Sequence, residues 1–329
     1  MRFMFLLVLC LLPLACSPKV NINFGDGGGR LVEHTVIDDR SRASEKIALI
    51  DVRGMLIDAR RPGLLGYGPN PVDQFVKALD KARNDGSVRG VVVRITSPGG
   101  TVTASDIMHD ELRRFREETG KPVIASIGEV GASGGYYLAL AADEIYVQPT
   151  SITGSIGVIF PTINASKGLG MIGIESRAVK SGPNKDLANP LEPAREAHYA
   201  LLQTQVDELY ARFRGLVIAR RPGLKPADID AATDGRVVTG NAAVGLGLAD
   251  AEGGVREAYA AAKTSAGIGP ARLVKYVDED ARAATTPYSV APAQTQINLV
   301  QVQLGEAGLG GRFGMEASGF YYLWLPEAW

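Results

Sequence analysis

Short apolar runs alternate with amphipathic stretches along the chain from Lys46 onward. Four runs of strand length, bounded by turn residues, have the pattern of buried strands: Ile47–Val52, Val88–Ile95, Pro122–Ile127 and Glu144–Val147. Asn70 and Pro71 form a helix-start signal between the first two runs. The apolar stripe of that helix consists of Val72, Phe75, Val76 and Leu79. A second amphipathic helix, with Met108, Leu112 and Phe115 on one face, is expected to end at Gly120. This alternation predicts right-handed βαβ units on a parallel sheet, an α/β fold.

The second half of the chain is less regular. A short helix is expected over Gly134–Ala142, and the longest helical pattern covers Glu192–Arg221. The stripe of the long helix consists of Leu202, Val206, Leu209, Phe213 and Val217. Such a stripe usually packs in the core, although a helix this long can also serve a partner. Beyond Ser265 the pattern weakens, before Phe320–Pro326 supplies a last apolar, strand-like segment.

The first residues read as an export signal. A positively charged start precedes the apolar stretch Phe3–Ala15, which is shorter than the ~20 residues needed to span a bilayer. The stretch runs into Leu12–Ser17, which resembles the lipobox at which a bacterial lipoprotein signal is cut before a lipidated cysteine, here Cys16, although its second residue is proline. Residues 17–43 lack an apolar period and are typical of a flexible tether. The folded body is therefore expected to start near Glu45, outside the cytoplasm.

Composition excludes several functions. The 329 residues carry a net charge of −1, which offers no field for phosphate backbones, so nucleic acid is not expected as the main partner. The two cysteines, Cys10 and Cys16, both lie in the export signal, which leaves the rest of the chain without a disulfide or a thiolate zinc site. His34, His109 and His198 match no metal-ligand spacing. We therefore expect neither a metal nor an organic cofactor.

A glycine-flanked serine follows the third expected strand. Within Gly131–Gly135, nothing bulky shields the hydroxyl of Ser133 at this strand-to-helix turn, where backbone N–H groups and the helix dipole can stabilise an oxyanion. One βα connection earlier, Ser97–Gly100 follows its own strand, so both loops open at the carboxyl edge of a parallel sheet. Ser133 is thus a candidate nucleophile, with the N–H of Gly99 or Gly100 near the carbonyl that it attacks. The alternative is two tight glycine turns that serve packing alone.

A nucleophilic serine needs a proton acceptor. His109 is expected inside the helix after the Gly-Gly loop and His198 near the start of the long helix, and neither position is compelling. A lysine whose pKa is lowered by burial is the other option. Val179–Asp186 contains two lysines, Lys180 and Lys185. From the residues alone, each reads as an ordinary surface lysine.

Six segments form a more specific pattern: Ser97–Gly100, Gly131–Tyr137, Thr153–Val158, Lys180–Asp186, Asp234–Gly240 and Gly245–Asp250. In order and spacing they resemble the signal peptide peptidase A (protease IV) family over roughly residues 46–260. The resemblance implies a Clp-protease/crotonase-like spiral of repeated ββα and βαβ units, with a long helix after the catalytic region. It implies Ser133 as nucleophile, Lys185 as general base and Ser155 as the hydroxyl that orients the lysine amine. The implied oxyanion hole consists of Gly99, Gly100 and Gly134.

The resemblance also implies a function. The expected activity is that of a serine endopeptidase that forms an acyl-enzyme and degrades cleaved signal peptides and other unfolded apolar peptides at a membrane of the bacterial cell envelope. A lipid on Cys16 would replace the transmembrane anchor of most relatives. The expected organisation is a lipoprotein-type signal over 1–16, a tether over 17–43, a peptidase domain over 44–264 and a C-terminal extension over 265–329.

Three questions stay open from the sequence. The chain holds one copy of the motifs, which implies a homo-oligomeric ring in which Ser133 and Lys185 meet within one subunit or across an interface. A non-catalytic, membrane-tethered scaffold of the same fold is an alternative function. A third reading is an esterase that pairs Ser133 with His198 and a carboxylate.

Overall fold

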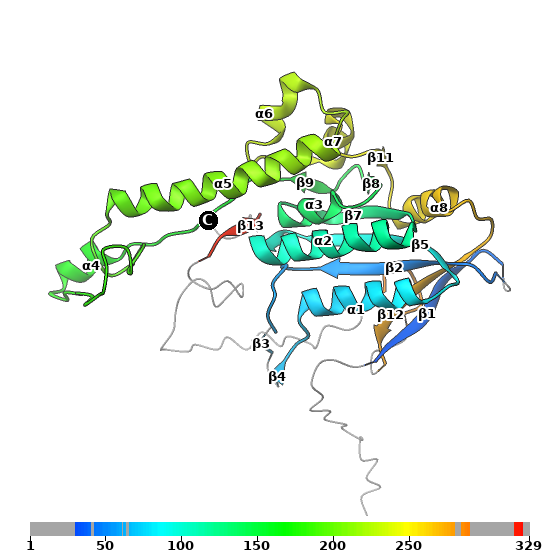
Figure 1. Ribbon diagram of the computed structural model, residues 1–329, viewed down its shortest axis with the longest axis horizontal. Coiled ribbons are helices and arrows are strands. Elements are labelled where there is room, and N and C mark those ends of the chain that lie inside the picture. Colours follow the sequence, from blue (N-terminus) through cyan, green and yellow to red (C-terminus); the bar gives the residue numbers. More distant parts are fainter. Residues whose placement is uncertain are drawn as a thin grey trace, which may run out of the picture.

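Most strands predicted from the apolar runs lie in one sheet of nine strands. The structure is a computed structural model, and it describes residues 30–40, 43–60, 62–63, 66–279, 284–289 and 319–324. The main order is β1-β12-β2-β5-β7-β8-β11 (Figure 1). Every neighbouring pair on this path is parallel except β1 with β12. These strands are β1 (Leu31–Asp38), β2 (Lys46–Arg53), β5 (Val88–Ser97), β7 (Val123–Ala132), β8 (Glu144–Val147), β11 (Ala251–Glu252) and β12 (Arg272–Asp278).

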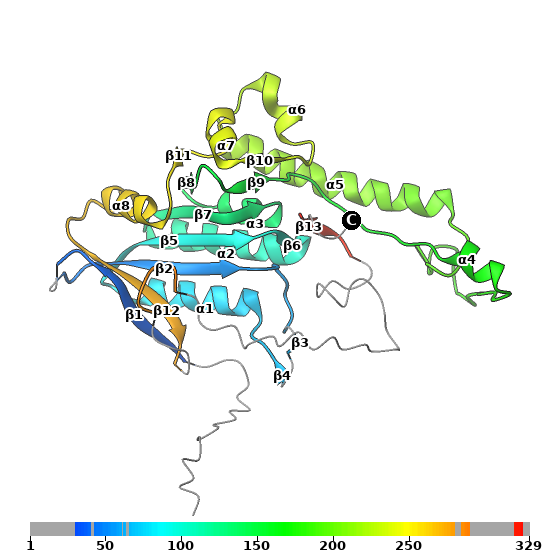
Figure 2. The same ribbon diagram turned by 180° about the vertical axis from the view of Figure 1, so that it is seen from behind.

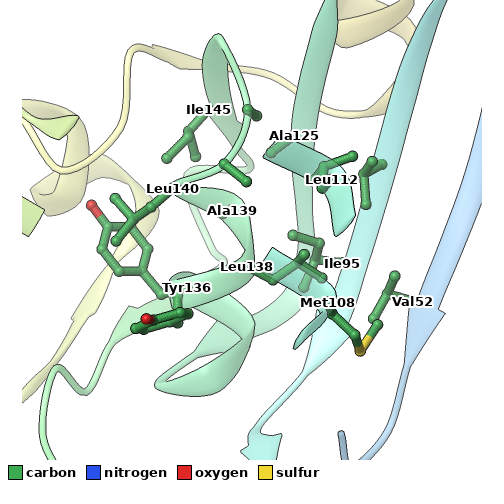
Figure 3. Close-up of a cluster of buried hydrophobic side chains, with 14 of the residues drawn as sticks. Val52, Ile95, Met108, Leu112, Ala125, Tyr136, Leu138, Ala139, Leu140 and Ile145 are labelled. Carbon is green, nitrogen blue, oxygen red and sulfur yellow. The ribbon is translucent and has the colours of Figure 1, made fainter. Parts of the chain in front are cut away.

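Helices cover both faces of the sheet, because side chains along each strand point alternately to one face and the other. Ala48 and Ile50 of β2 belong to a core with α1 (Pro71–Asn84), α2 (Val102–Thr119) and α3 (Gly134–Ala139). Figure 3 shows part of this core around α3. Ile47 and Leu49 face the other way, onto α8 (Val255–Ser265).

The predicted helix signals act as expected. The side chain of Asn70 accepts hydrogen bonds from the backbone N–H groups at the start of α1. Gly120 ends α2 in the left-handed region, at φ 64°. The start of α3 is as predicted, but the helix ends at Ala139 rather than Ala142.

Two short strands lie off the main strand order and give the fold its spiral character. After β5 the chain forms β6 (Gly99–Thr101) outside the main sheet before it enters α2, and after β8 it forms β9 (Ile152–Gly154) alongside the end of β7. These ββα and βαβ units confirm the predicted α/β fold of the Clp-protease/crotonase type. β6 pairs with β13 (Tyr321–Leu323), the predicted last apolar segment.

The remaining elements are small. They comprise β3 (Pro62–Gly63), β4 (Gly66–Tyr67), η1 (Pro226–Asp228), α6 (Ile229–Ala232), β10 (Val237–Thr239) and α7 (Gly240–Leu246). β10 pairs antiparallel with β9 and so covers the far side of the strand that borders β7.

An arm projects from the body, as Figures 1 and 2 both show. We use this name for residues 163–205, which contain α4 (Ser166–Met171) and the start of α5 (Glu196–Arg220). Only the later part of α5 packs into the core, through Phe213 and Val217. Of the stripe predicted for this helix, Leu202, Phe213 and Val217 are buried, whereas Val206 and Leu209 are partly exposed.

Two stretches assigned to the tether and to the C-terminal extension are strands of the sheet. β1 covers residues 31–38 of the expected tether, and β12 lies between β1 and β2. The sequence pattern does not predict β1 because Val36 is the only buried residue of this strand. It does not predict β12 because this strand carries a buried lysine, Lys275, which pairs with Asp51. The folded body therefore starts near Leu31 and continues beyond residue 264. Cys16 and the rest of the predicted export signal lie outside the described residues.

Candidate active site

Ser133 occupies a strained turn between β7 and α3. Its backbone has φ 52° and ψ −116°, a region that residues with a Cβ rarely adopt. Two backbone hydrogen bonds hold the turn. The Ser133 N–H donates to the Gly154 carbonyl at 2.8 Å, and the Tyr137 N–H donates to the Ser133 carbonyl at 2.8 Å. The fold thus forces this serine to the position that the glycine-flanked motif predicts, at the N-terminus of α3.

The hydroxyl of Ser133 is buried and unpartnered. The residue is 1% exposed, and its Oγ has no hydrogen-bond partner among the described residues. A buried hydroxyl without a partner costs free energy, and such groups in native proteins often have a catalytic role. With a proton acceptor beside it, this oxygen can act as a nucleophile.

The predicted glycines converge next to Ser133. β5 and β7 are parallel neighbours, so the loops after them meet at one sheet edge. A Cβ built on Gly134 would lie 3.2 Å from the Gly100 backbone N, and one built on Gly99 would lie 2.7 Å from the Gly134 N. Gly99 has φ +101°, and a Cβ on Gly100 would overlap the Leu56 carbonyl. Both positions therefore require glycine, and their backbones approach the start of α3.

Ser155 lies on the other side of the Ser133 turn. It follows Gly154, whose carbonyl accepts the hydrogen bond from the Ser133 N–H. Ser155 has φ 50° and is 7% exposed, and its own N–H donates to the Arg236 carbonyl at 2.7 Å. The structure thus brings Ser155 into the same neighbourhood as Ser133.

Lys185 lies apart, on the arm. It is exposed in a series of turns before α5, and its N–H donates to the Gly182 carbonyl. Next to it, Asp186 pairs with Lys180 and Arg195. The hydrogen bond from Lys180 lowers the pKa of Asp186 to about 2, so this ion pair holds the arm's turns at neutral pH. In a single copy, Lys185 therefore does not contact the Ser133 hydroxyl.

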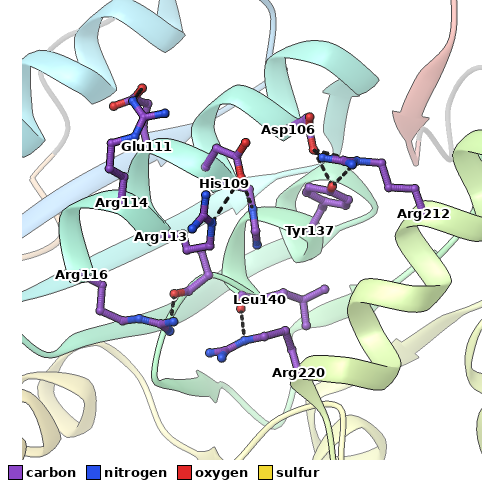
Figure 4. Close-up of polar contacts among 12 residues, drawn as sticks. Asp106, His109, Glu111, Arg113, Arg114, Arg116, Tyr137, Leu140, Arg212 and Arg220 are labelled. Carbon is purple, nitrogen blue, oxygen red and sulfur yellow. Dashed lines mark hydrogen bonds and ion pairs between the residues drawn. The ribbon is translucent and has the colours of Figure 1, made fainter. Parts of the chain in front are cut away.

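Neither candidate histidine contacts Ser133. The Nε2 atom of His198 lies 3.2 Å from the Pro183 carbonyl, within the arm. The ring of His109 packs edge-on against Tyr137, with centroids 5.2 Å apart, on the side of α2 that faces α3 and α5 (Figure 4).

The burial of His109 gives a pH-dependent stability. Burial lowers its pKa below the ordinary 6.5, against the opposing effect of Asp110. The unfolded chain therefore binds a proton at this site before the folded one does, so the contribution is present above pH 6.5 and is lost as the pH falls below it. We expect the urea midpoint of wild type to fall more steeply between pH 7.5 and 5.5 than that of His109→Leu. Equal slopes in the two proteins would contradict this assignment.

A polar network fixes α3 to its neighbours. The Tyr137 hydroxyl donates to Asp106 Oδ1 at 2.6 Å, and Arg212 of α5 donates to the same oxygen at 2.7 Å (Figure 4). Burial raises the pKa of Asp106, but the hydrogen bonds from Tyr137 and Arg212 outweigh it, so this pKa lies below its usual value. The network links α2, α3 and α5 behind the serine. Of the three residues of this network, only Tyr137 belongs to a motif found in the sequence. Nothing in the sequence indicates that it contacts Asp106 and Arg212, which are distant along the chain.

The chain resembles known proteases. Residues 115–269 match the family model of Peptidase family S49. A putative protease of Synechocystis is 32% identical, over 87% of this chain and 98% of the relative. Protease 4 of Haemophilus influenzae is 34% identical, over 74% of this chain and 40% of the relative, so the chain spans less than half of that protein. A putative signal peptide peptidase SppA of Enterococcus faecium is 28% identical, over 77% of this chain and 72% of the relative. Among solved structures, a membrane-bound stomatin-specific protease matches at a TM-score of 0.40 and 16% identity, over 66% of this chain and 84% of that one.

Proposed function

Because the chain belongs to peptidase family S49, the family of signal peptide peptidase A (protease IV), it is a protease, and we propose that it is a membrane-associated serine endopeptidase that degrades cleaved signal peptides and other unfolded apolar peptides. One observation carries the proposal: the Oγ of Ser133 is buried with no hydrogen-bond partner among the described residues, on a strained turn where the backbones of Gly100 and Gly134 converge.

The proposed reaction passes through an acyl-enzyme. Ser133 Oγ attacks the peptide carbonyl carbon while its proton moves to the amine of Lys185. The developing oxyanion accepts hydrogen bonds from the backbone N–H groups of Gly100 and Gly134. The N–H of Gly99, which the sequence also predicted as a donor, instead donates to the Ser97 hydroxyl at 3.1 Å and holds the loop. The lysine then protonates the leaving amine, and a water molecule that loses its proton to the same lysine releases the acyl group. In this scheme Ser155 orients the lysine amine.

We propose that a second copy of the chain completes the site. The arm carries Lys185 and exposes a series of large apolar side chains, among them Met171 at 88% and Ile172 at 71% exposure. An isolated chain gains nothing from such a surface, whereas a neighbouring subunit can bury it. If each arm packs on the body of the next copy, the contact is head-to-tail, and it forms the expected ring when the rotation between copies closes.

Attachment to the membrane is part of the same proposal. No helix in the described part of the chain has the length and apolar character needed to cross a bilayer. The lipobox-like Leu12–Ser17 supports a lipid on Cys16 as the anchor, in the bacterial cell envelope with the body outside the cytoplasm.

Replacing Gly100 by alanine should remove most of the activity. The added Cβ would overlap the Leu56 carbonyl, so β6 must shift and carry the Gly100 N–H away from the oxyanion. Loss of one such donor lowers kcat by on the order of 10²–10³. Gly86→Ala is the matched control, because no described residue lies within 4 Å of a Cβ built there. Steady-state kinetics checks both variants, and a wild-type kcat in Gly100→Ala would remove Gly100 from the proposed site.

The proposed function is tested by hydrolysis of an unfolded, leucine- and alanine-rich fluorogenic peptide. Wild type is expected to cleave it, and the Ser133→Ala variant is not. The metal chelator EDTA should leave the rate unchanged, because the proposed chemistry uses only side chains and backbone groups.

A further inference from the structure

The segment Phe320–Trp324 lies between β6 and the chain at Ile159, close to the start of α3. On one side it runs antiparallel to β6, with Tyr321 opposite Thr101 and Tyr322 opposite Gly100. On the other side Tyr321 exchanges two backbone hydrogen bonds with Ile159, each 3.0 Å long. A strand held in this way has the geometry of a bound extended peptide, in which main-chain hydrogen bonds supply affinity.

The register of this strand directs one carbonyl at the glycines of the site. The Val102 N–H donates to the Phe320 carbonyl at 3.1 Å, and the Trp324 N–H donates to the Pro98 carbonyl at 2.8 Å. Hydrogen-bonded positions of an antiparallel ladder recur every second residue, so Gly100 and Tyr322 face each other at the position between these two bonds. The Tyr322 oxygen also lies 3.1 Å from a Cβ built on Gly134. This carbonyl therefore lies where the proposed site would hold an oxyanion.

The side chain of Tyr322 fills a pocket behind the serine. It is fully buried and stacks on Tyr137, with ring centroids 5.1 Å apart. Its ring also packs on Phe213, with centroids 4.7 Å apart. Its hydroxyl donates to the Leu209 carbonyl at 3.0 Å. The pocket thus accepts a large aromatic side chain and offers its hydroxyl a partner.

We propose that Phe320–Trp324 is an internal occupant of the substrate cleft. This inference rests on the proposed peptidase, whose cleft would accept an extended peptide with a large aromatic residue on the acyl side of the cleaved bond. With the segment in place, Ser133 is 1% exposed, so a substrate must displace it first. A tethered ligand competes at an effective concentration that reaches millimolar, and the apparent affinity for free peptide falls with the fraction of open cleft.

The first test measures binding without turnover. In the Ser133→Ala background, a fluorescent peptide with the sequence of residues 319–324 is titrated against the full chain and against a chain that ends at residue 318. We expect the shortened chain to bind at least about tenfold more tightly. A peptide with alanine in place of Tyr322 should bind the shortened chain far more weakly. Equal affinities of the two chains, or of the two peptides for the shortened chain, would overturn the proposal.

The second test keeps the whole chain and locks the segment. Ile159 and Tyr321 form a hydrogen-bonded antiparallel pair, whose Cα atoms are about 5.5 Å apart, within the range that a disulfide spans. The variant Ile159→Cys/Tyr321→Cys should lose cleavage of the fluorogenic peptide when oxidised and regain it with a reductant. Each single variant should be insensitive to the reductant. Equal cleavage by the oxidised and reduced double variant would contradict the inference.

The two readouts separate this inference from the proposed function. If no form of the protein cleaves peptide but shortening still opens the cleft to the labelled peptide, the peptidase fails and the occupancy stands. If wild type cleaves peptide through Ser133 while neither shortening nor locking alters binding or rate, the occupancy fails and the peptidase stands.

Discussion

Replacing Ser133 by alanine should lower the rate of peptide cleavage by on the order of 10⁴–10⁶, because the variant lacks the oxygen that forms the acyl-enzyme. The fold should survive. Alanine keeps the Cβ, so the unusual backbone angles at this turn cost the same in both proteins. The lost hydroxyl is buried and has no hydrogen-bond partner in the described part of the chain, so its removal should leave the thermal midpoint unchanged or raise it. Fluorogenic kinetics and a thermal melt of the same samples test both expectations.

The matched control is Ser126→Ala, a buried serine within β7, the strand that leads into the Ser133 turn. It should cleave at the wild-type rate, which separates loss of the nucleophile from general damage to β7. Persistent cleavage by Ser133→Ala would exclude this serine as the nucleophile. A wild-type protein that is folded, assembled and inert on every such peptide would instead favour the non-catalytic scaffold.

Lys185→Ala should be as inactive as Ser133→Ala, yet the two variants together should be active. If the arm of one copy supplies the lysine to the next, a mixed ring holds some interfaces in which an intact Ser133 meets an intact Lys185. For random mixing in equal amounts this is about one quarter of the interfaces, so about a quarter of the wild-type rate should return. Co-expression of the two variants with different tags, followed by tandem purification, yields the mixed assembly for the assay.

Lys167→Ala serves as the control for this experiment, because Lys167 is another exposed lysine of the arm, on α4. It should retain the wild-type rate by itself. An inactive mixed assembly would show that Ser133 and Lys185 must come from the same chain. Activity in Lys185→Ala together with its loss in His198→Ala would revive the esterase reading, although His198 contacts Pro183 in this chain.

The parts of the fold that the sequence predicted are those whose signals are local. Asn70 starts one helix with its side chain, and Gly120 ends another with its left-handed backbone. The buried strands have apolar sequences because both of their faces are covered. β1 and β12 were missed because their partners lie at opposite ends of the chain and their burial is incomplete or polar. No local window contains the contact between Lys275 and Asp51 that allows a lysine inside the sheet.

The candidate site divides in the same way. Ser133, Gly99 and Gly100 were located from sequence because parallel neighbouring strands deliver their loops to one edge, a rule that needs no side-chain detail. The position of Lys185 on the arm could not be derived, because nothing local to Lys180–Asp186 says which surface its turns will face. The pairing of Tyr322 with Gly100 could not be predicted either, because it is made by backbone groups and glycine has no side chain that would indicate a partner.

The place of β12 in the sheet governs when the chain can fold. β12 lies between β1 and β2, so β2 has an open edge, and β1 has no partner, until residues 272–278 have been made. Such long-range pairing makes folding slow, because the chain loses the entropy of closing a large loop before the stabilising strand contacts form. A nascent chain therefore cannot complete its sheet during most of its synthesis. If the first residues act as the export signal that the sequence predicts, this delay keeps the chain in the unfolded form that can cross a membrane.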